Sequence, residues 1–180
     1  VVGIPFSIGA AQQLPPTVTS LEMSYVDHHI TQHLPRGLTT LTAYDVIMSA
    51  ELVKGLPKSL VHLKMSDPFW WKDHYDPATC EKLPLEVIRQ RYPTVYEDYE
   101  KQLWLGDACL PASLTSLTMH GFENLGDLFV RQRLPNLTFL NLDRSFDFPD
   151  SSIALLPRHL THLSLSESPH VSGKCFPNLP

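Results

Sequence analysis

The sequence predicts an α/β solenoid, in which short parallel strands from successive repeats stack into one sheet. Three observations lead to this prediction. A phrase that begins with Leu-Pro recurs along the chain. At the end of each copy, leucines alternate with other residues, which is the period of a strand with one buried face. Hydrophobic residues make up 43% of the 180 positions, enough for the continuous core that stacked repeats share.

The recurring phrase has the form LPxxLTxLxL and starts near residues 14, 34, 56, 110, 134, 156 and 176. We take its second hydrophobic position as the anchor of each repeat. The anchors are Val18, Leu38, Leu60, Leu114, Leu137 and Leu160. Subtraction gives spacings of 20, 22, 54, 23 and 23 residues. All but one lie within the range of about 20–29 residues that is typical of one solenoid unit with a strand.

The Leu-Pro pair of each copy is expected at the turn where the chain enters a strand. Proline fixes φ and has no N–H to donate, so it suits a turn better than a sheet ladder. This placement accounts for many of the 16 prolines. One copy cannot bury its own leucines, but a stack gives each leucine neighbours on both sides.

This phrase resembles leucine-rich repeats, and more narrowly the FNIP-type repeats of amoebae and giant viruses, in which LPxSLTxLxL recurs. The resemblance covers about residues 14–66 and 110–180. It implies short parallel strands on a concave face and irregular or 3-10 segments on the convex side. Leucine-rich repeats usually carry Asn or Cys eight residues after the anchor. Here those positions hold Val26, Val46, Pro68, Phe122, Ser145 and Ser168, so no asparagine ladder is expected.

The repeat rhythm is interrupted between residues 68 and 108, which we interpret as a partly helical insertion or as one degenerate repeat. This segment is dense in aromatic residues, including Trp70 and Trp71. Tryptophan is favoured in protein interfaces, so these two residues are candidate contacts for a partner. The alternative is that the aromatics seal the segment against the solenoid. We treat residues 1–180 as one solenoid fragment of a longer protein.

In each predicted strand, the residues two, four and six places after the anchor point away from the core and make the concave face. This face is mostly small and polar. Within it, the larger and charged side chains are the candidate contacts for a protein partner. They are Glu22, Thr42, Tyr44, His62, Lys64, Thr118, His120, Phe139, Asn141, Asp143 and His162.

Composition argues against several other classes of function. The net charge of −5 gives no basic footprint for nucleic acid. No apolar run reaches the roughly 18 residues of a membrane span, and the first residues lack the pattern of a signal peptide. The three cysteines are far apart and suit neither a disulfide framework nor a zinc site. We therefore expect a cytoplasmic protein that binds neither membranes nor nucleic acid.

Catalytic motifs are absent from the sequence, and we predict no enzyme activity, no cofactor and no metal. There is no GxSxG, HExxH or phosphate-binding glycine loop. His28, His29 and His33 lie close in sequence, but a closed zinc site needs about four ligands. Thr31 and Pro35 also argue against a sustained helix that would align these histidines.

The predicted function is therefore a protein–protein interaction module that presents its concave face to a protein partner. Two alternatives stay open. The chain could be the substrate-recognition arm of a larger ubiquitin-ligase-type or effector protein. It could also be a structural solenoid that self-associates through uncapped ends, because exposed repeat ends need a cover for their apolar surfaces.

Overall fold

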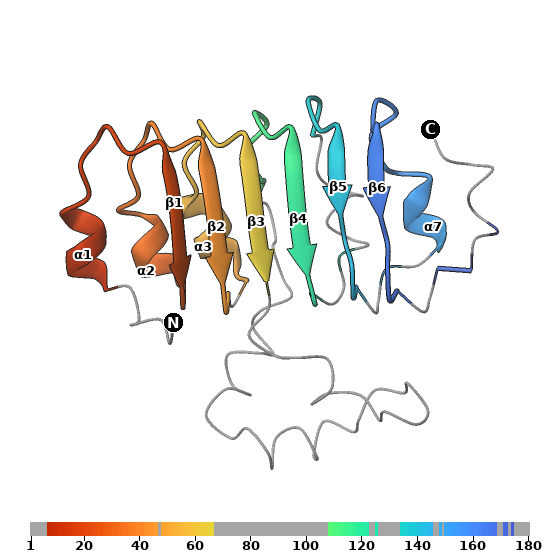
Figure 1. Ribbon diagram of the computed structural model, residues 1–180, viewed down its shortest axis with the longest axis horizontal. Helices are drawn as coiled ribbons and strands as arrows, with labels where there is room; N and C mark the ends of the chain where they lie inside the picture. The colour runs from red at the N-terminus through yellow and green to blue at the C-terminus, as the bar shows by residue number, and fades with distance from the viewer. Residues whose placement is uncertain are drawn as a thin grey trace, which may run out of the picture.

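Six parallel strands form one sheet in the order of the sequence, which confirms the α/β solenoid of leucine-rich-repeat type (Figure 1). The computed structural model describes residues 7–46, 48–66, 108–122, 125, 134–145, 148, 150–168, 171–172 and 174. The strands are β1 Ser20–Ser24, β2 Thr40–Tyr44, β3 His62–Ser66, β4 Ser116–His120, β5 Phe139–Asn141 and β6 His162–Ser164.

The strands pair in a register that aligns equivalent positions of the repeats. Leu21 is opposite Leu41, and Leu63 is opposite Leu117. Leu140 and Leu163 continue the same row in β5 and β6. Burial alternates along the strands as the sequence pattern predicts, since these inward positions are buried in β2 to β5 while their neighbours are half-buried or exposed.

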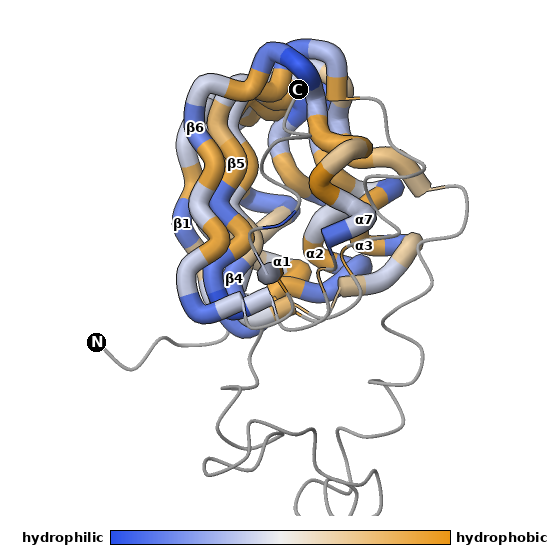
Figure 2. The backbone as a smooth tube through the Cα atoms, turned by 90° about the vertical axis from the view of Figure 1, so that its right-hand side faces the viewer, coloured by the Kyte–Doolittle hydropathy of each residue, from blue (hydrophilic) through white to orange (hydrophobic). Residues whose placement is uncertain are grey.

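The helices that the structure describes lie on the side of the sheet opposite its open face (Figure 2). They are α1 Ile8–Gln12, α2 His28–Thr31, α3 Ala50–Gly55 and α7 Asp150–Ile153. Ser7, Asp27 and Ser49 each cap a helix by accepting a backbone N–H. These convex segments were expected to be irregular or 3-10, but they are short α-helical turns because a capping side chain starts each of the first three.

The core fills the space between the sheet and these helices. Its fully buried members include Leu38, Leu60 and Leu114 at the anchors, together with Leu52 from α3. Figure 2 shows β1 and β6 farther from the helices than β4 and β5, so the sheet is concave on the face that points away from the core.

The threonine of the repeated phrase links several of the described repeats to the repeat before it. The carbonyl of Thr19 accepts the N–H of Thr39 at 2.8 Å and the Thr39 hydroxyl at 3.0 Å. Thr138 and Thr161 repeat this pattern, donating their hydroxyls to the Thr115 and Thr138 carbonyls at 3.2 and 3.1 Å. The threonine hydroxyl is thus a third donor to a carbonyl that already accepts two backbone N–H groups, and it adds one side-chain hydrogen bond to each of these links between repeats.

A second column of side chains joins the turns just before the anchors. The Ser59 hydroxyl lies 2.6 Å from the Arg36 carbonyl and 2.7 Å from the Leu38 carbonyl. Ser113 makes the same two contacts one repeat later, with Lys58 and Leu60. Asn136 continues the column by donating to Ala112 at 3.0 Å. The polar residue before the anchor therefore fastens each turn to the preceding turn.

Gly37 occupies this column without a side chain, and we expect Gly37→Ser to raise the free energy of unfolding by about 1 kcal/mol. A Cβ atom there would lie 3.7 Å from the Pro16 carbonyl oxygen, which is ordinary contact. The serine gains one hydrogen bond and also restricts the unfolded chain. Urea denaturation measures this free energy. Gly37→Ala is the control, because alanine restricts the unfolded chain as serine does but cannot make the hydrogen bond. Equal midpoints for the two variants would contradict the hydrogen bond.

Where the chain leaves each strand, the described residue seven places after the anchor has a positive φ, in the left-handed region of backbone conformation. Gly121 has φ 80° there, and the equivalent residues are Tyr25, Asp45, Arg144 and Glu167, with φ between 53° and 64°. A left-handed residue turns its N–H toward the next repeat: that of Arg144 donates to the Ser166 carbonyl at 2.8 Å. A residue other than glycine holds this conformation at a cost of about 1 kcal/mol.

The sheet steps directly from β3 to β4, although their anchors are 54 residues apart. The predicted insertion or degenerate repeat at 68–108 lies almost wholly outside the described residues, as do Trp70, Trp71 and the copy that begins near 176. Over the described ranges, no helix has the length and apolar character needed to cross a membrane.

Candidate partner-binding face

The concave face consists of three rows of outward side chains, two, four and six places after the anchors. Register aligns the first two rows across all six strands: for example, Ser116 lies between His62 and Phe139, and Thr118 lies between Lys64 and Asn141. In the third row, register pairs β1 with β2 and β3 with β4. The predicted candidate residues within the repeats all lie on these rows. The outward residues of the middle strands are half-buried or exposed, so they are accessible over the described part of the chain.

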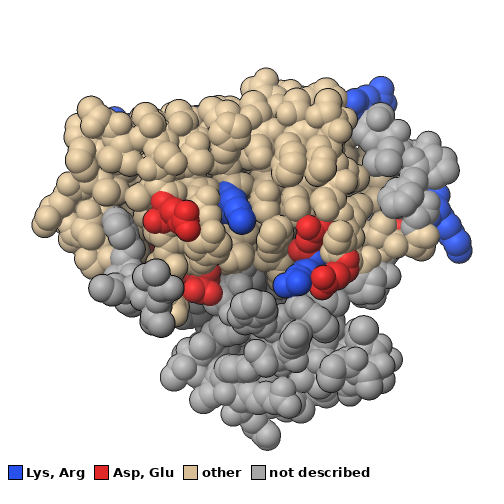
Figure 3. Space-filling view, in the orientation of Figure 1, with Lys and Arg blue, Asp and Glu red and all other residues tan. Residues whose placement is uncertain are grey.

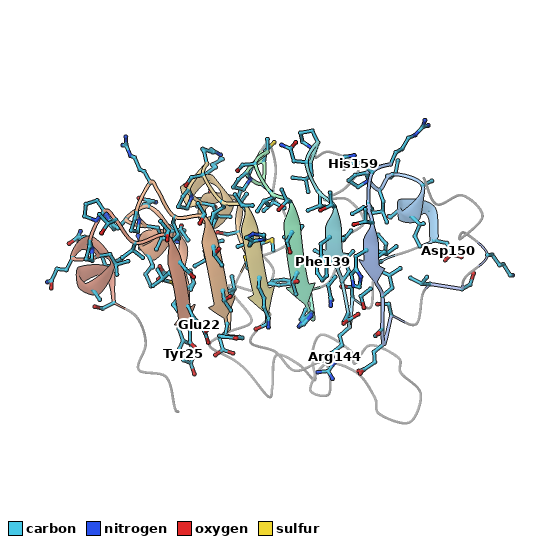
Figure 4. All side chains as sticks on the ribbon, turned by 45° about the horizontal axis from the view of Figure 1, so that its top comes forward. Glu22, Tyr25, Phe139, Arg144, Asp150 and His159 are labelled. Atoms are coloured by element: carbon cyan, nitrogen blue, oxygen red, sulfur yellow. The ribbon has the colours of Figure 1, made fainter. Side chains whose placement is uncertain are left out.

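An aromatic pair stands on the C-terminal half of this face. The rings of Phe139 on β5 and His162 on β6 are stacked with centroids 4.4 Å apart and planes 3° from parallel. Figure 4 labels Phe139 on its strand. The register places the two residues opposite each other, because both are two places after an anchor. This pair offers an aromatic surface of the kind that often anchors an interface.

A polar network lies beside this pair, past the end of β5. Asp143 accepts the Ser164 hydroxyl at 2.6 Å and the Ser166 N–H at 2.8 Å with one carboxylate oxygen. Its other oxygen accepts from the Asn141 amide at 3.0 Å. His120 Nε2 lies 3.1 Å from the oxygen of the same amide. These contacts hold four side chains from β4, β5 and β6 in fixed positions.

The pKa of Asp143 lies below its ordinary value of 3.8. Partial burial is the largest single influence and raises the pKa, because it disfavours the charged form. The hydrogen bonds from Ser164, Ser166 and Asn141 lower it, and the charge on His120 lowers it further. Together these contacts outweigh burial, so Asp143 is ionised at neutral pH and stabilises the network as an anion.

We expect Asp143→Asn to lower the free energy of unfolding by about 1 kcal/mol at neutral pH, since it removes charged hydrogen bonds at a partly solvated site. Because the folded pKa is depressed, the stabilisation is complete above the unfolded pKa and is lost as the pH falls through the folded value. The gap between wild type and variant should therefore be present at neutral pH and close as the pH falls below about 4. Urea titrations at several pH values measure it, and a gap that persists in acid would contradict the assignment.

Tyr44 and Lys64 come together on the N-terminal half of the face. The Lys64 ammonium lies 5.8 Å from the centroid of the Tyr44 ring, within the range of a cation–π contact. Four other candidates make no side-chain hydrogen bond or ion pair with another described residue: Glu22, Thr42, His62 and Thr118. The structure therefore divides the candidates into a preorganised C-terminal group and a more open N-terminal and central group.

Two features at the rim of the face were not predicted from the sequence. Tyr25 is 54% exposed and its backbone φ is 57°, in the left-handed region. Figure 4 shows it beside Glu22 at the end of β1. Arg144 and Glu167 form an ion pair of 3.1 Å between adjacent repeats. Both features lie seven places after an anchor. Their recurrence at that place is the one sequence signal that could have identified them.

The three histidines that are close in sequence and were considered as a metal site lie on the convex side. His28 and His29 are in α2, with ring centroids 3.8 Å apart. His33 lies beyond the end of the helix, where its Nε2 is 3.4 Å from the Gln12 amide nitrogen. In the described ranges, no three His, Cys, Asp or Glu side chains are grouped as a metal site would require.

Comparison with known proteins found no matching family model and no matching curated protein. Among solved structures, the chain is similar to the leucine-rich repeat-containing protein LegL7 from Legionella pneumophila at 14% identity, with 89% of this chain and 60% of that chain covered and a TM-score of 0.34. It is also similar to CroV588, a circular leucine-rich-repeat protein, at 20% identity, with 89% and 22% covered and a TM-score of 0.37. The chain thus spans less than two thirds of either protein. The assignment of the fold depends on the strand order and register of this chain itself.

Proposed function

We propose that this chain is a protein-interaction module that binds a protein partner on its concave face. The observation that carries the proposal is the grid of aligned outward side chains across six strands, in which an aromatic pair and a tyrosine stand among small polar residues. Interfaces are typically organised in this way, with a few aromatic anchors surrounded by polar contacts.

The anchors proposed for this interface are Tyr44 and Phe139. Each is half-buried on the concave face and lies next to a cationic or imidazole side chain, Lys64 and His162 respectively. A partner that covers both anchors would span the strands from β2 to β5. Aromatic side chains favour such a role because they bury a large area with little loss of conformational freedom.

The test is affinity capture from cell extract, with the whole chain as bait. We expect the double variant Tyr44→Ala/Phe139→Ala to lose about tenfold or more of its affinity for the captured partner while its circular dichroism is unchanged. Leu155→Ala is the matched control, because Leu155 is 48% exposed and follows α7 on the convex side. If the double variant captures the same partner as well as the control does, the concave face is not the binding surface.

Self-association is a second candidate that one observation favours. Val18 and Leu21 of the first described repeat are half-buried, whereas Leu38 and Leu41 at the same places in the next repeat are 0% and 1% exposed. A second chain stacked on β1 would cover this apolar edge. Light scattering over a range of concentrations tests it, and a constant monomer mass would reject it. The role as a recognition arm of a larger ligase or effector stays a prediction.

A further inference from the structure

One isolated cation stands in the middle of the concave face. Lys64 on β3 is the only Lys or Arg among the outward side chains of the described strands. In Figure 3, which looks onto this face, most of the surface is tan, one blue group lies near its centre with red groups on either side, and a second blue group lies beside red ones at its lower edge. Lys64 makes no ion pair with a described residue, and its ammonium lies 5.8 Å from the centroid of the Tyr44 ring.

Acidic side chains are absent from the outward positions of β2, β3 and β4. Among the described residues, acids flank these strands at Glu22 on β1, Asp45 in the turn after β2 and Asp143 past the end of β5. Asp143 is already engaged by Ser164, Ser166 and Asn141. The outward positions of β2, β3 and β4 therefore carry one lysine and no acid, in a chain whose net charge is −5.

Hydroxyl groups surround Lys64 on the neighbouring strands. Register places Thr42 on one side of Lys64 and Thr118 on the other, at the strand spacing of about 4.8 Å. Ser116 lies next to His62 in the adjoining row. The hydroxyls of Thr42, Ser116 and Thr118 make no hydrogen bond with another described residue, in contrast to the threonines that link the repeats. They are available to donate to a ligand.

We propose that β2, β3 and β4 bind an acidic segment of the protein partner, with one of its carboxylates at the Lys64 ammonium. The inference rests on the proposed function and specifies the chemistry of the partner. A carboxylate at Lys64 would accept hydrogen bonds from the hydroxyls of Thr42 and Thr118, and charge complementarity would orient the segment over the middle of the face. A carboxylate is favoured over a phosphate because no outward side chain of the described strands is arginine, the residue best suited to bidentate phosphate contacts.

The test uses the whole chain labelled with ¹⁵N and titrated with a short synthetic peptide of alternating Glu and Ala, observed by two-dimensional NMR. We expect shifts in the backbone amides of β2, β3 and β4, and weaker binding as salt is raised. A peptide with Lys in place of Glu should cause no such shifts. Lys64→Gln should weaken binding of the acidic peptide about tenfold, and Lys64→Glu should reverse the preference between the two peptides.

Lys54→Gln is the matched control, because it removes the same charge from an exposed position in α3 on the convex side. If Lys54→Gln weakens binding as much as Lys64→Gln, or if the shifts spread over the convex side, the peptide senses only overall charge and the inference is wrong. Binding of a phosphoserine peptide in preference to the Glu peptide would also overturn it.

The two proposals fail in different ways. If the partner captured from extract depends on Tyr44 and Phe139 but is indifferent to Lys64→Gln, the acidic-segment inference is wrong and the interaction function stands. If capture is insensitive to Tyr44 and Phe139 while the Glu peptide still binds at Lys64, the proposed anchors are wrong and the acidic site stands.

Discussion

Replacement of Leu117 by alanine is expected to lower the free energy of unfolding by about 3 kcal/mol. Leu117 is 0% exposed in β4, a strand with a neighbouring strand on each side. Its side chain lies in the row of inward leucines between Leu63 and Leu140. The change removes buried methyl groups and leaves a cavity that the surrounding repeats can fill only in part, so both the transfer and the cavity terms contribute.

Thr118→Ala is the matched control for this prediction. Thr118 is the next residue in the same strand, but it points outward and is half-buried. Its replacement should change the stability by less than about 0.5 kcal/mol. Urea denaturation followed by circular dichroism measures both variants. Similar losses for the two variants would mean that the inward and outward rows are wrongly assigned, because a shift of one residue exchanges the faces of a strand.

The strands could be predicted from the sequence because the two-residue alternation of a strand is visible in each repeat. Alternation of leucine with polar residues fixes which side of the strand is inward, and six anchors fix the order of the stack. The rows of the concave face follow from that register, which is why Tyr44, Lys64 and Thr118 lie where the pattern predicts. Whether these residues contact a partner stays a prediction.

Contacts between distant side chains could not be predicted in the same way. The Asp143 network joins residues of three repeats, and its hydrogen bonds depend on side-chain rotamers that a repeat pattern does not determine. The convex helices depend on capping by Ser7, Asp27 and Ser49, which the leucine pattern does not include. Left-handed residues such as Tyr25 and Arg144 were also missed, because glycine, the usual sign of this conformation, is present only at Gly121.

The convex layer is close-packed at one point, where α3 meets α2. A substitution at that point is expected to have a large effect on the free energy of unfolding. Gly55 is the last residue of α3. A Cβ atom on it would lie 2.3 Å from the Thr31 hydroxyl oxygen, 3.0 Å from the Thr31 Cβ and 3.2 Å from the Gln32 nitrogen. Thr31 is 1% exposed and its hydroxyl donates to the His28 carbonyl at 3.1 Å, so it has little room to move. Glycine is present here because only a bare Cα allows this approach of the two helices.

We therefore expect Gly55→Ala to lower the free energy of unfolding by about 2 kcal/mol, although alanine is ordinarily the better helix former by up to about 1 kcal/mol. Gly9→Ala in α1 is the matched control, because the only atom of a described residue within 4 Å of its new Cβ would be the Ser7 hydroxyl oxygen at 3.9 Å. That control should be neutral or stabilising. The double variant Thr31→Ala/Gly55→Ala should recover part of the loss, since it removes the closest contact. A Gly55→Ala protein as stable as the Gly9→Ala protein would show that α2 and α3 are farther apart than the structure places them.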